Sequence, residues 1–300
     1  MANGHDQLFK TLLTSYPADF LSLVHPDLLT RVDPKRIRFE SIELYLDTVP
    51  GAGRPRRPDL VAELYTRDNT QRPVGCLHVE IENRFRQRTR SRLAAYNQLI
   101  SLRYGVPVAT VGLFLRGGPA GIEIAMHQEQ LFGEILARIV YRTLGLSAAE
   151  AVNYLDRSEP LAWALAALMR PPPGMNRLEH RIACLARVAN NPDHDPRKAH
   201  LIDCVDAYLP VAVDERDAYE KLLQDIEEVR ELTLTWSESF REEGRIAGKR
   251  ETLLHQVERR LGDVTTHTKR RVESIEDSSE LDRMLDAFLD GASLDELGLI

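Results

Sequence analysis

The spacing of apolar residues changes along the first 120 residues and predicts helices alternating with strands. Leucines and phenylalanines in residues 5–24 recur at helical intervals, with an interruption at Pro17. Three following stretches alternate in polarity or are rich in β-forming residues: residues 37–46, 59–66 and 75–82. Residues 88–103 return to helical spacing, and residues 106–115 form the nearly continuous apolar run of a strand buried on both faces. The order helix, three strands, helix, strand predicts an α/β core with a mixed sheet.

The pattern beyond residue 120 predicts helices. Residues 128–170 and 175–210 are expected to be helical, separated by the helix-breaking run PPPG at residues 171–174. Residues 214–261 form a long polar stretch whose apolar positions fall at steps of three and four, and residues 265–300 fit two small helices. We therefore expect four parts along the chain: a core of residues 1–125, a helical extension of residues 126–213, a helical arm of residues 214–262 and a small helical module of residues 263–300.

Composition is that of a soluble globular protein. The 300 residues are 43% apolar and 28% charged, with a formal net charge of −7. The longest apolar run, residues 161–169, is about half of the ~20 residues that a membrane-spanning helix needs, so we expect no membrane association. The N-terminus lacks the pattern of a secretory signal, and the odd number of cysteines without CxxC spacing argues against a disulfide framework or a zinc ribbon. These features predict a cytoplasmic protein.

Charge is distributed unevenly along the chain. Residues 51–120 contain 12 Arg, no Lys and 5 acidic residues, a net charge of +7. Residues 201–300 contain 13 basic and 25 acidic residues, a net charge of −12. A local arginine-rich segment can contact phosphate groups, while the acidic remainder limits non-specific binding. Composition alone equally allows arginine to be simply the preferred surface cation.

Two predicted strands bring acidic residues toward the same place. Asp59 opens one strand, and Glu80 lies near the end of the next; because side chains alternate along a strand, His78, Glu80 and Glu82 share one face. Converging carboxylates repel each other unless a cation is present, and their oxygen atoms suit Mg²⁺ or Mn²⁺. A hard divalent ion beside arginines can activate a water for attack on a phosphodiester and neutralise the negative charge that develops. From spacing alone, an ordinary exposed strand face is the alternative.

Four motifs resemble the PD-(D/E)xK nuclease superfamily. They are residues 57–61 (RPDLV), 77–83 (LHVEIEN), 96–97 (YN) and 104–109 (YGVPVA). More narrowly, the chain resembles the bacterial Rpn-like group, described as recombination-promoting nucleases or transposases, and residues 5–10 (HDQLFK) resemble the start of that family. Residues 240–250 and 254–300 resemble a small C-terminal domain of unknown function that often follows. The resemblance implies a restriction-endonuclease-like core followed by an α-helical C-terminal region.

The resemblance also implies a catalytic site. Asp59 and Glu80 match the motif's metal-binding acids, with the backbone carbonyl of Ile81 as a further ligand. Glu82 completes the implied catalytic set, but it stands where the superfamily usually has Lys and this group often has Gln. An ionised Glu can only accept hydrogen bonds, so Glu82 either binds a second metal ion or marks an impaired site. Arg84 and His78 are candidates for the missing donor.

Arginine recurs at every second position immediately after the acidic strand. Arg84, Arg88 and Arg92 are the preferred phosphate contacts, since a helix places Arg88 and Arg92 on one face. A solvated turn and helix start is the alternative interpretation. His78 is a candidate for a supporting position beside Glu80, although a packed strand histidine is the ordinary reading.

Together these residues predict a Mg²⁺- or Mn²⁺-dependent endonuclease acting on double-stranded DNA, linked to recombination or mobile elements. The alternative is a catalytically decayed nuclease fold that serves as a DNA-binding or protein-interaction module. The chain has no GxGxxG or GxxxxGK[ST] motif, so no nucleotide cofactor is expected. The apolar stripe of the helical arm predicts a homodimer formed through that arm.

Overall fold

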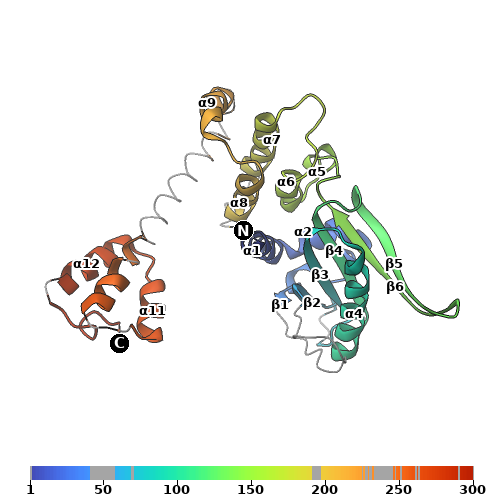
Figure 1. The fold of residues 1–300 in the computed structure, drawn as a ribbon, viewed down its shortest axis with the longest axis horizontal. Helices are drawn as coiled ribbons and strands as arrows, with labels where there is room; N and C mark the ends of the chain where they lie inside the picture. Colours follow the sequence, from blue (N-terminus) through green and yellow to red (C-terminus); the bar gives the residue numbers. More distant parts are fainter. Residues whose placement is uncertain are drawn as a thin grey trace. The chain divides into compact units, whose positions relative to one another are not determined.

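The chain forms two compact units, residues 1–229 and residues 230–300, in the computed structural model (Figure 1). The structure describes residues 2–40, 58–68, 71–190, 197–224, 226, 229, 232, 246, 248–250, 252–260, 262, 264–289 and 291–299. None of the helices in these ranges is both long enough and apolar enough to cross a membrane.

A mixed sheet is the centre of the first unit. Its six strands, as far as the chain is described, follow the order β1-β2-β3-β4-β6-β5. They are β1 (Phe39–Glu40), β2 (Leu60–Leu64), β3 (Gly75–Arg84), β4 (Val108–Arg116), β5 (Gly121–Leu131) and β6 (Glu134–Gly145). Strands β1, β2 and β3 pair antiparallel, β4 is parallel to both β3 and β6, and β5 is antiparallel to β6. The predicted α/β class with a mixed sheet is thus confirmed, although most of the strand predicted at residues 37–46 lies outside the described residues.

Helix α4 (Gln87–Tyr104) connects the parallel strands β3 and β4 and packs against the sheet (Figure 1). Its buried side includes Tyr96 and Ile100, which contact Val61 of β2 and Cys76 of β3. The helix ends at Gly105, whose positive φ of 67° is easily adopted without a side chain, and whose N–H bonds the Ser101 carbonyl. The crossover between β3 and β4 therefore determines which face of α4 is turned toward the ends of β2 and β3.

The remaining α-helices in the described part of this unit lie at both ends of the core sequence. They are α1 (Ala2–Ser15), α2 (Pro17–Val24), α3 (Pro26–Leu29), α5 (Val152–Leu155), α6 (Pro160–Ala166), α7 (Arg177–Ala189), α8 (Lys198–Tyr208) and α9 (Arg216–Gln224). Pro17 separates α1 from α2 as predicted, because proline is tolerated in the first turn of a helix and not inside it. The helices predicted within residues 175–210 are confirmed by α7 and α8.

Helix α1 is held in place by a helix nearly 200 residues later in the chain. The rings of Phe9 and Tyr208 meet edge to face, with centroids 5.8 Å apart. Arg197, at the start of α8, donates a 2.8 Å hydrogen bond to the Ser15 carbonyl, and its guanidinium lies over the Tyr16 ring. These contacts with α8 help to hold α1, the helix that carries Lys10, in place.

The helix predicted from residue 128 onward is wrong as far as residue 145. Residues 121–145 instead form the β5–β6 hairpin, whose two turn residues, Phe132 and Gly133, have φ angles of 50° and 88°. Positive φ at both positions is typical of a type I′ turn, in which Asn-Gly is the usual sequence. The sequence Phe-Gly does not predict such a turn. Several apolar residues of the hairpin are exposed, so the alternation of apolar and polar residues does not show which face of the hairpin is buried.

The second unit is a small helical bundle. Residues 252–260 are helical and pack with α11 (Thr266–Glu273) and α12 (Ser278–Leu289). Leu253, Val257, Val272, Ile275, Leu281, Phe288 and Leu299 form its buried core. The two small helices predicted in residues 265–300 are confirmed. Of the predicted arm, α9 covers the beginning, while most of residues 225–251 lie outside the described part of the chain.

Candidate active site

The strand register brings Asp59 and Glu80 together. Leu60 pairs with Val79, so Asp59, immediately before β2, stands opposite Glu80. The Asp59 N–H donates a 3.0 Å hydrogen bond to Glu80 Oε1, and the Ile81 N–H donates a 2.9 Å hydrogen bond to Asp59 Oδ2. Each carboxylate is thus held by the backbone of the neighbouring strand. The position of each carboxylate is therefore set by the strand pairing as well as by its own side-chain rotamer.

A buried chain of polar groups orients Glu80 from inside the protein. Glu80 is 3% exposed and His78 is fully buried, with Nε2 lying 3.3 Å from Glu80 Oε1 and Nδ1 lying 3.2 Å from Thr110 Oγ1. An ionised carboxylate only accepts, so Nε2 donates to it; neutral His78 then accepts at Nδ1 from the Thr110 hydroxyl. Asn97 Nδ2 donates to Thr110 Oγ1 at 2.9 Å and so completes the chain.

Two cationic side chains reach the carboxylates from helices. Lys10 Nζ of α1 lies 3.0 Å from Asp59 Oδ1. Arg92 Nη2 of α4 lies 3.4 Å from Glu80 Oε2 and also forms an ion pair with Glu82 Oε1. Three acidic and two basic side chains therefore share the end of β2 and β3, with one negative charge in excess when His78 is neutral.

Burial dominates the electrostatics of Asp59. Its pKa is raised above the ordinary 3.8, first because burial disfavours the charged form and second because Glu80 is close. The Ile81 N–H and Lys10 oppose this rise without cancelling it. The two carboxylates thus remain mutually repulsive, and additional positive charge at this place would be stabilising.

The donor set suits a hard divalent cation held by few protein ligands. Asp59 and Glu80 supply carboxylate oxygens, which Mg²⁺ and Mn²⁺ prefer. Continuing the β2–β3 register places Pro58 opposite Ile81, and proline has no N–H to bond the Ile81 carbonyl. Within the described ranges, no three His, Cys, Asp or Glu side chains are arranged to hold a metal ion. The predicted ligand set needs only two such side chains, together with one backbone carbonyl. Mg²⁺ commonly keeps several waters as its other ligands.

A pocket opens beside Asp59 on the side of α1. Its volume is about 390 Å³. It is lined by Gln7, Lys10, Thr11, Thr14, Phe39, Pro58, Asp59 and Leu60. The lining combines one acidic group with a lysine and several uncharged donors, so an anionic group entering here would meet the Lys10 ammonium directly.

The three arginines predicted to contact phosphate differ in their surroundings. Arg84 ends β3 and is exposed, and Arg88 is exposed in the first turn of α4. Arg92 follows one turn later on the same helix, as expected, but it is partly buried and turned toward Glu80 and Glu82. Neither Arg84 nor His78 supplies the donor beside Glu82 in this arrangement; Arg92 does.

Sequence reasoning missed the roles of Lys10, Thr110 and Asn97. Lys10 and Asn97 lie within runs that carry the family resemblance, HDQLFK and YN, and this was the available signal. Thr110 had no signal, since it stands as one hydroxyl within an apolar strand. Its contact with His78 appears only when β3 and β4 are paired in register.

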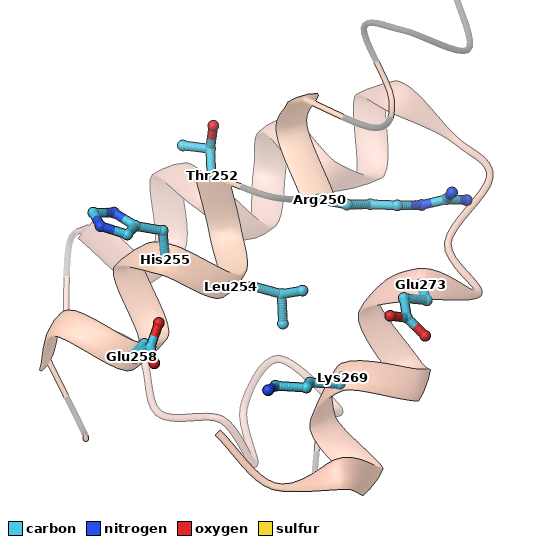
Figure 2. Close-up of a pocket in the computed structure, with 7 residues that line it drawn as sticks. All are labelled: Arg250, Thr252, Leu254, His255, Glu258, Lys269 and Glu273. Carbon is cyan, nitrogen blue, oxygen red and sulfur yellow. The ribbon is translucent and has the colours of Figure 1, made fainter. Parts of the chain in front are cut away.

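A second pocket, of about 680 Å³, lies in the C-terminal unit (Figure 2). Leu254, Lys269 and Glu273 point toward the space between the helices, while His255 lies at its margin (Figure 2). The Arg250 guanidinium, also in the lining, donates to the Ile275 carbonyl and so stabilises the bundle. The pocket mixes charges of both signs, with Arg250 and Lys269 beside Glu258 and Glu273.

Comparison with known proteins identifies no relative. No protein-family model, no curated protein and no solved structure matches this chain. Function is therefore inferred from the residues and their geometry.

Proposed function

We propose that this chain is a Mg²⁺- or Mn²⁺-dependent endonuclease that hydrolyses phosphodiester bonds in double-stranded DNA, on a restriction-endonuclease-like core. The observation that carries the proposal is the direct juxtaposition of Asp59 and Glu80 across adjacent strands, with Lys10 and Arg92 beside them. The antiparallel β2–β3 pair and the parallel β3–α4–β4 crossover are compatible with the core that the family resemblance implies.

The residues divide into those that hold the ion and those that hold the substrate. Asp59, Glu80 and the Ile81 carbonyl would hold the cation, which supplies an acidified water and neutralises charge on the phosphate. His78 keeps Glu80 in position by donating to Oε1. Once the carboxylates hold the cation, Lys10 and Arg92 can turn their donors to phosphate oxygens.

Arg92 offers a way for this chain to function with Glu at position 82. Glu82 cannot donate a hydrogen bond, whereas the Arg92 guanidinium carries only donors and lies against Glu82 and Glu80. Glu82 then positions Arg92, and Arg92 supplies the positive charge that Lys usually provides. Arg84 and Arg88, both exposed nearby, would hold the DNA backbone on either side.

A second candidate function is a non-catalytic DNA-binding or protein-interaction module. It is favoured by the ion pairs themselves, because Asp59, Glu80 and Glu82 each already have a protein cation as partner. If Arg92 and Lys10 stay in place permanently, they occupy the position that a metal ion would take. The basic surface at Arg84 and Arg88 would then bind nucleic acid without cleavage.

Nicking of supercoiled plasmid by the full-length chain distinguishes the two candidates. We expect nicking with Mg²⁺ or Mn²⁺, none with EDTA, and a loss of about 100-fold or more in Glu80→Gln, as for removal of one key electrostatic contact. Glu63→Gln is the matched control, since Glu63 lies on β2 and bonds the Tyr65 hydroxyl away from the site. DNA retardation without nicking under every metal condition would support the second candidate, and absence of both would refute both.

A further inference from the structure

The outer edge of β5 is a long strand edge, with a register irregularity between Glu129 and Gln130 near the turn. β5 ends the sheet order, and no strand in the described part of the chain pairs with its outer side. Its 11 residues, Gly121–Leu131, include neither proline nor lysine, the residues that commonly protect an edge from pairing. Figure 1 shows the β5–β6 hairpin projecting beyond the rest of the sheet.

One face of the hairpin carries exposed apolar side chains. Ile124 is 69% exposed and Met126 is 45% exposed, and Val140 of β6, which pairs with Met126, is 56% exposed. Four further large apolar residues are exposed around the turn: Leu131, Phe132, Ile135 and Leu136. Exposed apolar side chains beside a strand edge are typical of a protein-binding surface; on this face the polar pair of Gln128 and Arg138 separates Ile124, Met126 and Val140 from the residues at the turn.

We propose that β5 pairs antiparallel with β5 of a second copy of this chain, joining the two sheets into one, with Ala125 opposite its own copy. A twofold axis perpendicular to the sheet must pass between a residue and its copy, so only a few registers are possible. The register at Ala125 places Ile124 opposite Met126 of the second copy. It also places Glu123 opposite His127 of the second copy, and each pairing occurs twice.

The neighbouring registers match less well. Centring the axis on Met126 places Glu123 opposite Glu129 of the second copy, and like charges directly opposite are destabilising. Centring it on Ile124 places Glu123 opposite Ala125, which leaves the acid without a polar partner. Of these three registers, only the one at Ala125 combines an apolar pair with a hydrogen-bonding Glu–His pair on opposite faces of the sheet. This axis also keeps each face on its own side, so Val140 of both copies extends the apolar surface.

Self-association of the full-length chain, measured by sedimentation equilibrium, tests the interface. We expect a dimer that His127→Glu weakens by about tenfold in Kd, because two cross-strand pairs become repulsive. Adding Glu123→Lys to His127→Glu restores opposite charges and recovers the native affinity. Ile124→Lys also weakens the dimer, whereas Leu102→Lys, at an 81% exposed position on α4, is the matched control that leaves it unchanged.

Site-directed cross-linking tests the register. Cys76, Cys184 and Cys204, all the cysteines of the chain, are buried, so Ala125→Cys introduces an accessible thiol. Mild oxidation should link two copies through residue 125, while Glu129→Cys should not cross-link, since residue 129 faces residue 121 of the second copy. A monomer at all concentrations overturns the proposal. A dimer that ignores His127→Glu and fails to cross-link at residue 125 overturns it as well, and directs attention to the C-terminal arm.

Discussion

Replacing Arg92 by methionine removes one of the protein's own cations from the site, so that the effect of a bound metal ion can be measured by itself. Methionine keeps much of the length and apolar volume of the side chain but removes its charge. Glu80 then loses the ion pair at Oε2, and Glu82 loses the same partner, while His78 and the Asp59 N–H remain on Glu80 Oε1. Without added metal we therefore expect a less stable protein.

The size of that loss follows from the burial of the partners. Removing one member of a fully buried ion pair costs about 3–5 kcal/mol. Here the Glu80 side chain is 4% exposed but Arg92 is 27% exposed, and Glu80 retains two donors, so we expect about 2 kcal/mol. Arg92 Nε is also buried without a hydrogen-bond partner, and its removal offsets part of the cost. A loss of this size lowers Tm by roughly 4–8 °C for a unit of this length.

Magnesium should reverse the effect if the site binds a cation. A ligand present at 100 times its Kd stabilises the folded state by about 2.7 kcal/mol. In Arg92→Met the ion does not compete with a guanidinium, so the rise in Tm with Mg²⁺ should exceed that of the native chain. Thermal unfolding followed by circular dichroism, with and without Mg²⁺, measures both effects. Arg88→Met, one turn earlier and exposed, is the control and should change stability by less than about 0.5 kcal/mol. A destabilised Arg92→Met that does not respond to Mg²⁺ or Mn²⁺ would refute the cation site.

Three further changes test the site and the fold. The raised pKa of Asp59 favours folding most below its ordinary value of 3.8, and this contribution is lost as the pH rises through the raised pKa. Asp59→Asn should therefore gain stability relative to the native chain as the pH rises from 3.8 through the raised pKa, measured by urea unfolding; a constant difference would contradict the raised pKa. Glu82→Gln should retain or increase plasmid nicking, because Gln accepts from Arg92 and also donates; a tenfold loss would show that Glu82 is a ligand. Gly145→Ala should cost about 3 kcal/mol or more in urea unfolding, since its Cβ would overlap the Pro119 carbonyl oxygen. Gly248→Ala, with open space around it, should be close to neutral, and equal losses at both glycines would contradict the close approach at Gly145.

The core strands were predictable because their local sequence has the composition of buried strands. Residues 59–66, 75–82 and 106–115 have the β-rich composition of strands that pack against helices, and β2, β3 and β4 lie there. The β5–β6 hairpin was not predictable in the same way. Ile124 and Met126 sit on an exposed face, so alternation in polarity does not report which side is buried, and the turn at Phe132 lacks the residues that usually adopt positive φ.

The candidate site was predictable in its acids and not in its cations. Asp59 and Glu80 are separated by one strand connection, so pairing of adjacent strands is enough to bring them together. Lys10 and Arg92 reach the same place from two helices, along flexible side chains whose targets depend on tertiary packing. Spacing on α4 places Arg88 and Arg92 on one side of the helix, but it does not tell which of them is directed toward the carboxylates.

The docking of α1 against α8 bears on when the site is completed during synthesis. Asp59, Glu80 and Arg92 leave the ribosome early, and the strands that carry them can pair before the later helices exist. Lys10 is translated even earlier, yet α1 is anchored by Arg197 and Tyr208, which are made more than a hundred residues after Glu80. We therefore expect a nascent chain to pair its acids before Lys10 is fixed beside Asp59. The contacts that anchor α1 to α8 can form only after α8 has emerged.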